Sequence, residues 1–137
     1  MPESGGDFVQ LLDPDGNRVD HPEFSYTGSD AEIAASLRDM VLTRRFDAEA
    51  TALQRKGELG LWPPSLGQEA AQIGSARAIT DRDQTVPSYR EHGVAWVRGI
   101  DMTALLGVFR GSGMVDLDAR ASRFQLYSWV IGGHLLL

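Results

Sequence analysis

The segment Pro87–Gly93, with the sequence PSYREHG, carries side chains that could bind an anion. The guanidinium of Arg90 offers a planar fork of donors to phosphate oxygens, and the phenol of Tyr89 adds another donor. A helix that begins beside this pair would add the positive potential of its first N–H groups. The pair therefore predicts an anion clamp. For an isolated Tyr-Arg pair, the alternative is a surface arginine beside a half-buried tyrosine.

His92 follows Tyr89 by three positions, so one helical turn would place both side chains on the same face. A histidine there could orient a phosphate or shuttle protons near neutral pH, which makes His92 the candidate catalytic residue. A satisfied structural histidine is the alternative. The other histidines, His21 and His134, lie too far away in sequence to form a local metal motif with it.

The composition limits the classes of function. The chain has 137 residues, which is one domain's worth of sequence, and its 42% hydrophobic and 23% charged residues are typical of a globular protein. A net charge of −6, with dispersed basic residues, argues against a nucleic-acid surface. The absence of cysteine excludes a disulfide framework, a thiolate nucleophile and a Cys-based zinc site.

Neither end of the sequence predicts a role in a membrane. Residues 1–7 lack the basic-then-apolar order of a secretory signal, so we expect a cytoplasmic location. The apolar run Trp129–Leu137 is too short to span a bilayer. Its composition is that of an interrupted core element.

Mostly helical elements must position the anion clamp. Residues 1–28 are rich in Gly, Pro and Asp, and the turn at 13–16 indicates a small hairpin in an N-terminal arm. Ser29 or Asp30 can cap a long helix that should end near Gly57. The positions that recur at helical spacing in this helix are Ile33, Leu37, Met40, Val41, Arg44, Ala48, Ala52 and Leu53.

Shorter elements follow the long helix. Residues 70–77 predict a second helix, whose small side chains would let another backbone approach closely. Residues 85–87 suggest a short extended piece, and 94–97 and 102–109 suggest two short helices. The predicted organisation is an arm over residues 1–28 and one truncated domain over residues 29–137.

Several segments, in this order and at this spacing, resemble the α subunit of the thiamine-diphosphate-dependent 2-oxo acid dehydrogenases, the first component of the pyruvate and branched-chain complexes. The segments are LDPDG at 12–16, LTRRFD at 42–47, GQEAA at 67–71, PSYREHG at 87–93, RG at 98–99 and FRG at 109–111. The likeness runs from about Phe8 to Leu137. It implies an α/β fold, the N-terminal part of a thiamine-diphosphate-binding fold, mostly helical in this fragment with short strands.

The resemblance also implies cofactor-binding residues. Tyr89 and Arg90 match the family's pair that binds the diphosphate of thiamine diphosphate. The segment 129–132 occupies the place where the family holds the aminopyrimidine ring, with Ile131 favouring the bent cofactor. Trp129 departs from the small residue usually found there. The alternative is that Ile131 is simply a core residue.

Other parts of the family's site are absent from this sequence. The family binds magnesium through a Gly-Asp-Gly segment and a later Asn, which this chain lacks, so we expect the metal ligands beyond Leu137. The implied partners are the β subunit in an α2β2 assembly, the lipoyl acyltransferase component and a 2-oxo acid substrate. The segment Trp62–Ser65 lacks the histidine of animal pyruvate-type members, which leaves pyruvate and branched-chain substrates both open.

The resemblance implies a component that oxidatively decarboxylates a 2-oxo acid and transfers the acyl group to lipoamide. We expect the isolated chain to be inactive. One alternative is a truncated non-catalytic remnant or a protein-interaction module. Another is a generic phosphate-ligand domain, which Tyr89 and Arg90 alone would support.

Overall fold

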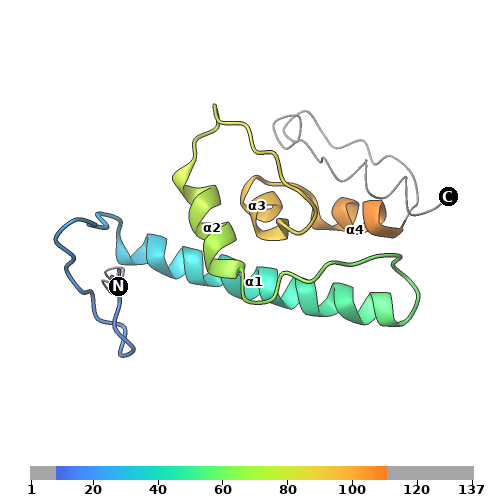
Figure 1. The fold of residues 1–137 in the computed structure, drawn as a ribbon, viewed down its shortest axis with the longest axis horizontal. Helices are drawn as coiled ribbons and strands as arrows, with labels where there is room; N and C mark the ends of the chain where they lie inside the picture. Colours follow the sequence, from blue (N-terminus) through green and yellow to red (C-terminus); the bar gives the residue numbers. More distant parts are fainter. Residues whose placement is uncertain (1–8, 111–137) are drawn as a thin grey trace, which may run out of the picture. The chain divides into compact units, whose positions relative to one another are not determined.

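The computed structural model describes residues 9–110, and within them the chain forms four helices (Figure 1). They are α1 (Asp30–Arg55), α2 (Glu69–Ala78), α3 (His92–Val97) and α4 (Met102–Arg110). The chain divides into two units, Met1–Ile33 and Ala34–Leu137. All four helices lie where the sequence patterns predict helix.

The predicted short strands were wrong for the part of the chain that the structure describes. Between residues 9 and 110 no strand is present. Residues 85–87 form none, and Pro87 has no N–H to donate to a ladder. In the first unit, Leu12 and Arg18 form an isolated antiparallel bridge, and backbone hydrogen bonds from Asp13 to Asn17 at 2.9 Å and from Val19 to Leu11 at 3.0 Å lie beside it.

In the first unit, a tight turn joins the two sides of this small hairpin. The Asp13 carboxylate accepts the N–H groups of Asp15 at 2.9 Å and Asn17 at 2.7 Å. Gly16 has a φ of +86°, a conformation that costs glycine little. The predicted turn in the arm is therefore confirmed as a hairpin with one bridge.

Local signals fix both ends of α1. Ser29 and Glu32 form a capping box, in which Glu32 Oε2 accepts the Ser29 N–H at 2.6 Å and Ser29 Oγ accepts the Glu32 N–H at 3.3 Å. At the other end Gly57 has a φ of +77° and donates its N–H to the Gln54 carbonyl, while Glu58 donates to Leu53. This pattern is a Schellman motif, which ends the helix where the glycine predicts.

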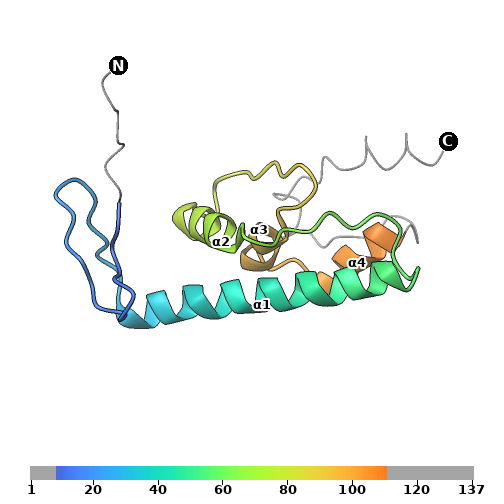
Figure 2. The same cartoon turned by 60° about the horizontal axis from the view of Figure 1, so that its bottom comes forward.

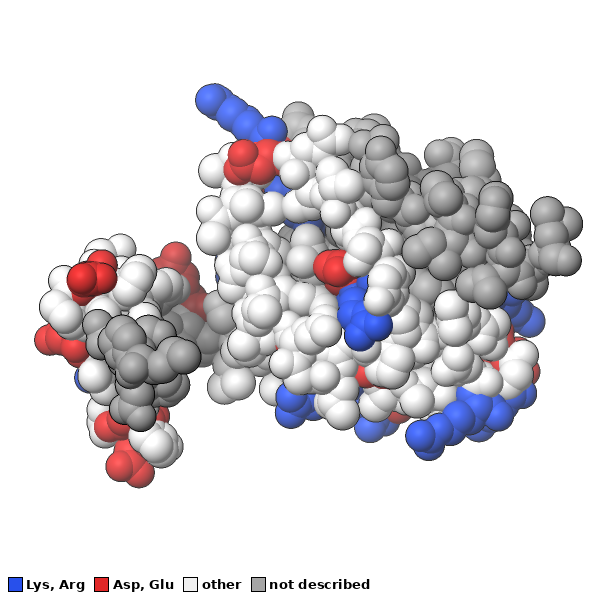
Figure 3. All heavy atoms as spheres, viewed as in Figure 1, with Lys and Arg blue, Asp and Glu red and all other residues white. Residues whose placement is uncertain are grey.

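In the second unit, α2, α3 and α4 lie on one side of α1 (Figure 2). The α1 residues buried on that side are Thr43, Asp47 and Ala50. Leu37 and Val41 are 58% and 59% exposed, so the apolar spacing predicted the helix but not its buried face. On the face in Figure 3, Lys and Arg atoms gather along the edge where α1 lies, which is the side turned away from the other helices.

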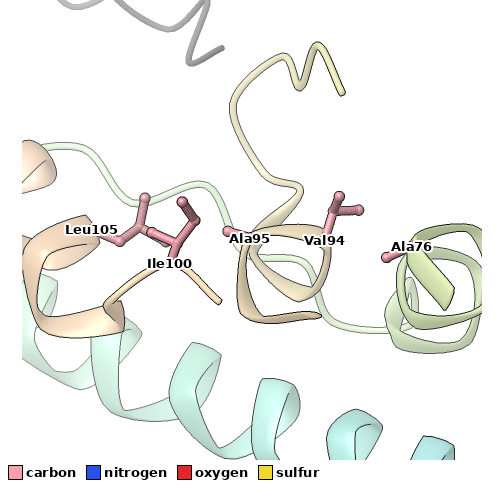
Figure 4. Close-up of a cluster of buried hydrophobic side chains, with 5 residues drawn as sticks. All are labelled: Ala76, Val94, Ala95, Ile100 and Leu105. Atoms are coloured by element: carbon pink, nitrogen blue, oxygen red, sulfur yellow. The ribbon is translucent and has the colours of Figure 1, made fainter. Parts of the chain in front are cut away.

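Two apolar clusters hold the second unit together. One contains Ala76, Val94, Ala95, Ile100 and Leu105, and so joins α2, α3 and α4 (Figure 4). The other joins α1 to the segment that follows it.

The second cluster contains Ala50, Leu59 and Trp62. Phe46 and Phe109 pack against both clusters. The two clusters therefore form a continuous apolar interior.

The close backbone approach predicted for the second helix does occur, but a glycine of α3 makes it. A Cβ added to Gly93 would lie 3.1 Å from Gln72 Cβ and 3.3 Å from Ile73 Cδ1. A Cβ added to Gly74 of α2 would meet nothing within 4 Å. Of the helices in residues 9–110, none has the length and apolar character needed to cross a membrane.

Candidate functional site

The anion clamp, Tyr89 and Arg90, lies immediately before α3. Arg90 Nη2 donates to Tyr89 Oη at 3.0 Å, and Arg90 Cζ lies 4.7 Å from the centroid of the Tyr89 ring. Tyr89 is 39% exposed and Arg90 is half-buried. A guanidinium carries five N–H donors, so this contact leaves it the capacity to bind a phosphate group. The structure thus brings the two predicted residues together at the surface.

The backbone of the anion clamp folds around the carboxylate of Glu91. Glu91 Oε2 accepts the N–H groups of Ser88 at 2.9 Å, Tyr89 at 3.1 Å and Arg90 at 3.1 Å. Burial raises the pKa of Glu91, but the hydrogen bonds to its carboxylate, including those from the Arg90 N–H and the Ser88 side chain, together outweigh burial and the net shift is downward. The spacing Ser88-x-x-Glu91 was visible in the sequence as a capping-box pattern.

A second support for the anion clamp comes from Gln72 of α2. Its Nε2 donates to the Arg90 carbonyl at 3.0 Å, and its Oε1 accepts the Gly93 N–H at 2.8 Å. Gln72 is 5% exposed. Sequence reasoning missed this residue, because no local pattern tells which side of α2 faces the start of α3.

His92, two residues after the anion clamp, is buried. Its Nε2 lies 3.3 Å from the Pro63 carbonyl, and its ring is stacked on Trp62 with centroids 4.2 Å apart. The prediction that one helical turn puts His92 and Tyr89 on one face was wrong, because α3 begins at His92 and Tyr89 precedes it. Burial lowers the pKa of His92 and favours the neutral imidazole. This environment fits the structural alternative for His92.

Asp47 ties α1 to the segment around Trp62. Its Oδ1 accepts the Trp62 indole N–H at 3.1 Å and the Ser65 N–H at 3.0 Å. All three residues are buried. Because Trp62 in turn stacks on His92, one series of contacts runs from α1 through this segment to His92, two residues after the anion clamp.

An ion pair between the exposed Arg44 and the buried carboxylate of Glu69 joins α1 to the start of α2. Arg44 Nε donates to Glu69 Oε1 at 2.8 Å, and Glu69 Oε2 accepts the Gly67 N–H at 3.0 Å. The hydrogen bond from Arg44 is the largest cause that lowers the pKa of Glu69 to about 2. The segments LTRRFD and GQEAA are therefore held together by an ion pair within the chain.

The remaining candidates lie elsewhere. His21 lies in the first unit, where its Nδ1 accepts the N–H groups of Glu23 and Phe24, each at 3.2 Å. Trp129, Ile131 and His134 lie outside the described residues. Among residues 9–110, no three His, Asp or Glu side chains gather in a way that could hold a metal ion.

Comparisons with known proteins found one matching family and several similar sequences. Residues 37–128 match the family model described as Dehydrogenase E1 component. The chain is 42% identical over 92 residues to 3-methyl-2-oxobutanoate dehydrogenase subunit alpha of Mycobacterium tuberculosis, which covers 67% of this chain and 25% of that protein.

Two pyruvate dehydrogenase relatives are also similar. The identity is 34% over 110 residues to the mitochondrial pyruvate dehydrogenase E1 component subunit alpha of Kluyveromyces lactis, covering 77% of this chain and 27% of the relative. It is 36% over 92 residues to the corresponding subunit of Staphylococcus epidermidis, covering 65% and 24%. The chain spans about a quarter of the length of these relatives.

Proposed function

Because the chain belongs to the dehydrogenase E1 component family, we propose that it supplies the diphosphate-binding part of a 2-oxo acid dehydrogenase α subunit. The observation that carries this proposal is the anion clamp. Arg90 and Tyr89 are in contact, and both reach solvent. The side chains of Glu91 and Gln72 form hydrogen bonds with the Arg90 backbone and hold it in place. A fixed guanidinium beside a phenol suits a phosphate group better than a mobile surface arginine does.

The cofactor in this proposal is thiamine diphosphate with magnesium. The donor set of the anion clamp fits the diphosphate, since it offers N–H and O–H groups and a positive charge. In the proposal Trp129 and Ile131 contact the aminopyrimidine ring, and the magnesium ligands come from beyond Leu137. When bound, the thiazolium of this cofactor takes up the electron pair released by decarboxylation.

The residues of this chain would act by binding and positioning. Arg90 and Tyr89 hold the diphosphate, and this contact orients the rest of the cofactor. His92 stays the candidate catalytic residue from the sequence, but its contacts with Trp62 and Pro63 support a role in holding the nearby segment in place. We propose two protein partners, the β subunit in an α2β2 assembly and the lipoyl acyltransferase. The proposed substrate is pyruvate or a branched-chain 2-oxo acid.

The full reaction is the oxidative decarboxylation of that 2-oxo acid with transfer of the acyl group to lipoamide, in the cytoplasm. A second candidate function is a non-catalytic remnant that binds another protein. The observation that favours it is the exposed pair Leu37 and Val41 on α1, which presents apolar area to solvent. The two candidates differ in whether the anion clamp binds diphosphate.

The test is calorimetric titration of thiamine diphosphate with magnesium into the chain, alone and with a β subunit. We expect binding in the presence of β, and a loss of about tenfold or more in affinity on Arg90→Ala, since a charge-assisted contact contributes roughly 1.5–3 kcal/mol. Tyr89→Phe should weaken binding less. Arg45→Ala, at an exposed arginine of α1, is the matched control and should leave affinity unchanged. Equal affinities for all variants would refute the proposal.

A further inference from the structure

The side-chain amide of Gln72 spans the start of α3 from the side of α2. Its donor binds the carbonyl of Arg90 and its acceptor binds the N–H of Gly93, at 3.0 Å and 2.8 Å. A second contact of Nε2, 3.2 Å to Gln68 Oε1, fixes the orientation of the amide. One buried side chain therefore holds both ends of the segment 90–93.

The glycine at position 93 makes this contact possible. The Cβ of any other residue there would lie 3.1 Å from both Cβ and Oε1 of Gln72. Contacts of that length are tighter than ordinary packing, so a side chain at 93 would push the Gln72 amide away. Gln72 and Gly93 thus form a matched pair across the α2 and α3 interface.

The direction of the Arg90 guanidinium depends on this backbone. The Arg90 carbonyl accepts a hydrogen bond from Gln72 of α2, so a helix outside the segment 90–93 holds the Arg90 backbone. A long side chain binds an anion more tightly when its starting point is fixed, because less conformational freedom is lost on binding. A rigid Arg90 backbone would therefore raise the affinity of the anion clamp without touching the ligand.

We propose that Gln72 is the positioning residue of the anion clamp, and that its bridge from the Arg90 carbonyl to the Gly93 N–H aims the Arg90 guanidinium at a diphosphate group. This inference rests on the proposed function for the identity of the ligand. The bridge itself is a property of the chain. The identity of the ligand and the role of the bridge can therefore be tested with separate readouts.

Two variants of Gln72 separate the halves of the bridge. Gln72→Met has a similar length and removes both hydrogen bonds. Gln72→Glu keeps an oxygen for the Gly93 N–H but removes the donor to the Arg90 carbonyl. Gln68→Glu is the charge control, since it adds a carboxylate one turn away and still offers an oxygen to Gln72 Nε2.

The experiment measures two quantities for the full chain with a β subunit. The first is the Kd for thiamine diphosphate with magnesium, and the second is the hydrogen-exchange rate of the Gly93 amide. For Gln72→Met we expect faster exchange and a Kd raised roughly fivefold to tenfold. For Gln72→Glu we expect protection of Gly93 to persist while the Kd still rises. Gln68→Glu should stay within about twofold of wild type for the Kd.

Two results would overturn the positioning role alone. The first is an unchanged Kd for Gln72→Met despite faster exchange at Gly93, which would make the bridge purely structural. The second is an unchanged exchange rate in that variant. If the wild-type chain with β binds no thiamine diphosphate, the proposed function fails, and the positioning role fails with it. These outcomes are distinguishable because only the last involves the wild type.

Discussion

The imidazole of His92 lies nearly parallel to the indole of Trp62, with 4.2 Å between ring centroids and 17° between planes. Both residues are almost fully buried, at 3% and 2% exposed. The stack links the segment after α1 to the first residue of α3, directly behind the anion clamp. The histidine that the sequence offered for chemistry therefore lies in the packed interior.

Because His92 is buried in this stack, its imidazole should stay neutral at pH values at which an exposed histidine is protonated. Burial lowers the pKa of His92 from 6.5, so the native imidazole gives up its proton before an unfolded one does. As the pH falls below 6.5, the unfolded state takes up a proton first, and His92 then makes the native state less stable. An NMR titration of the His92 ring should give a midpoint below 6.5. A midpoint above that value would contradict the burial argument.

The ion pair between Arg44 and Glu69 predicts a separate acid transition. The pKa of Glu69 is lowered from 4.5 to about 2, so its stabilising contribution is complete above 4.5 and is lost as the pH falls towards 2. Glu69→Gln should lower the free energy of unfolding at pH 7, and the difference from wild type should shrink over that acid range. Urea unfolding of both proteins at several pH values measures this difference in the free energy of unfolding.

The control for this prediction is Glu49→Gln. Glu49 pairs with Arg45 on the exposed side of α1, where both side chains are more than half exposed. Exposed pairs contribute little, so this variant should unfold almost like wild type at every pH. A loss as large as that of Glu69→Gln would show that burial of the Glu69 carboxylate does not distinguish the two pairs.

Asp47 should be among the most sensitive polar residues of the second unit. Asp47→Ala would leave the Trp62 indole N–H and the Ser65 N–H without their acceptor inside the protein. Each buried unsatisfied donor costs about 1–3 kcal/mol, so for two donors we expect a loss of about 2–6 kcal/mol in the free energy of unfolding. Asp47→Asn keeps an oxygen and should cost less. Equal losses for the two variants in denaturant titration would argue against this role of Asp47 as a hydrogen-bond acceptor.

Two glycines in different conformations should respond oppositely to alanine. Gly57 has a φ of +77°, so Gly57→Ala should destabilise the protein by about 1 kcal/mol. Gly74 lies within α2, where an added Cβ meets nothing within 4 Å, so Gly74→Ala should stabilise it by about 0.5–1 kcal/mol. Thermal unfolding of the two variants compares them directly. Shifts of the same sign would contradict the assigned backbone conformations.

The sequence alone determined the features that depend on neighbouring residues. A cap of α1 at Ser29 or Asp30, the glycine end of α1 and the turn at 13–16 were all predicted, because each is a hydrogen-bond pattern within a few positions, and the structure selects Ser29 as the cap. The ordered segments also indicated the family that the comparison of residues 37–128 confirms. The Tyr89 and Arg90 contact needed no long-range information either, since the residues are adjacent.

Tertiary structure decided which faces are buried and which residues support the anion clamp. Leu37 and Val41 follow helical spacing, yet the buried side of α1 contains Thr43 and Asp47. The role of Gln72 depends on how α2 packs against α3, and the burial of His92 depends on Trp62. Such partners lie many positions apart, and no local propensity encodes them. The packing of side chains between helices selects these partners, and the sequence pattern only limits the choice.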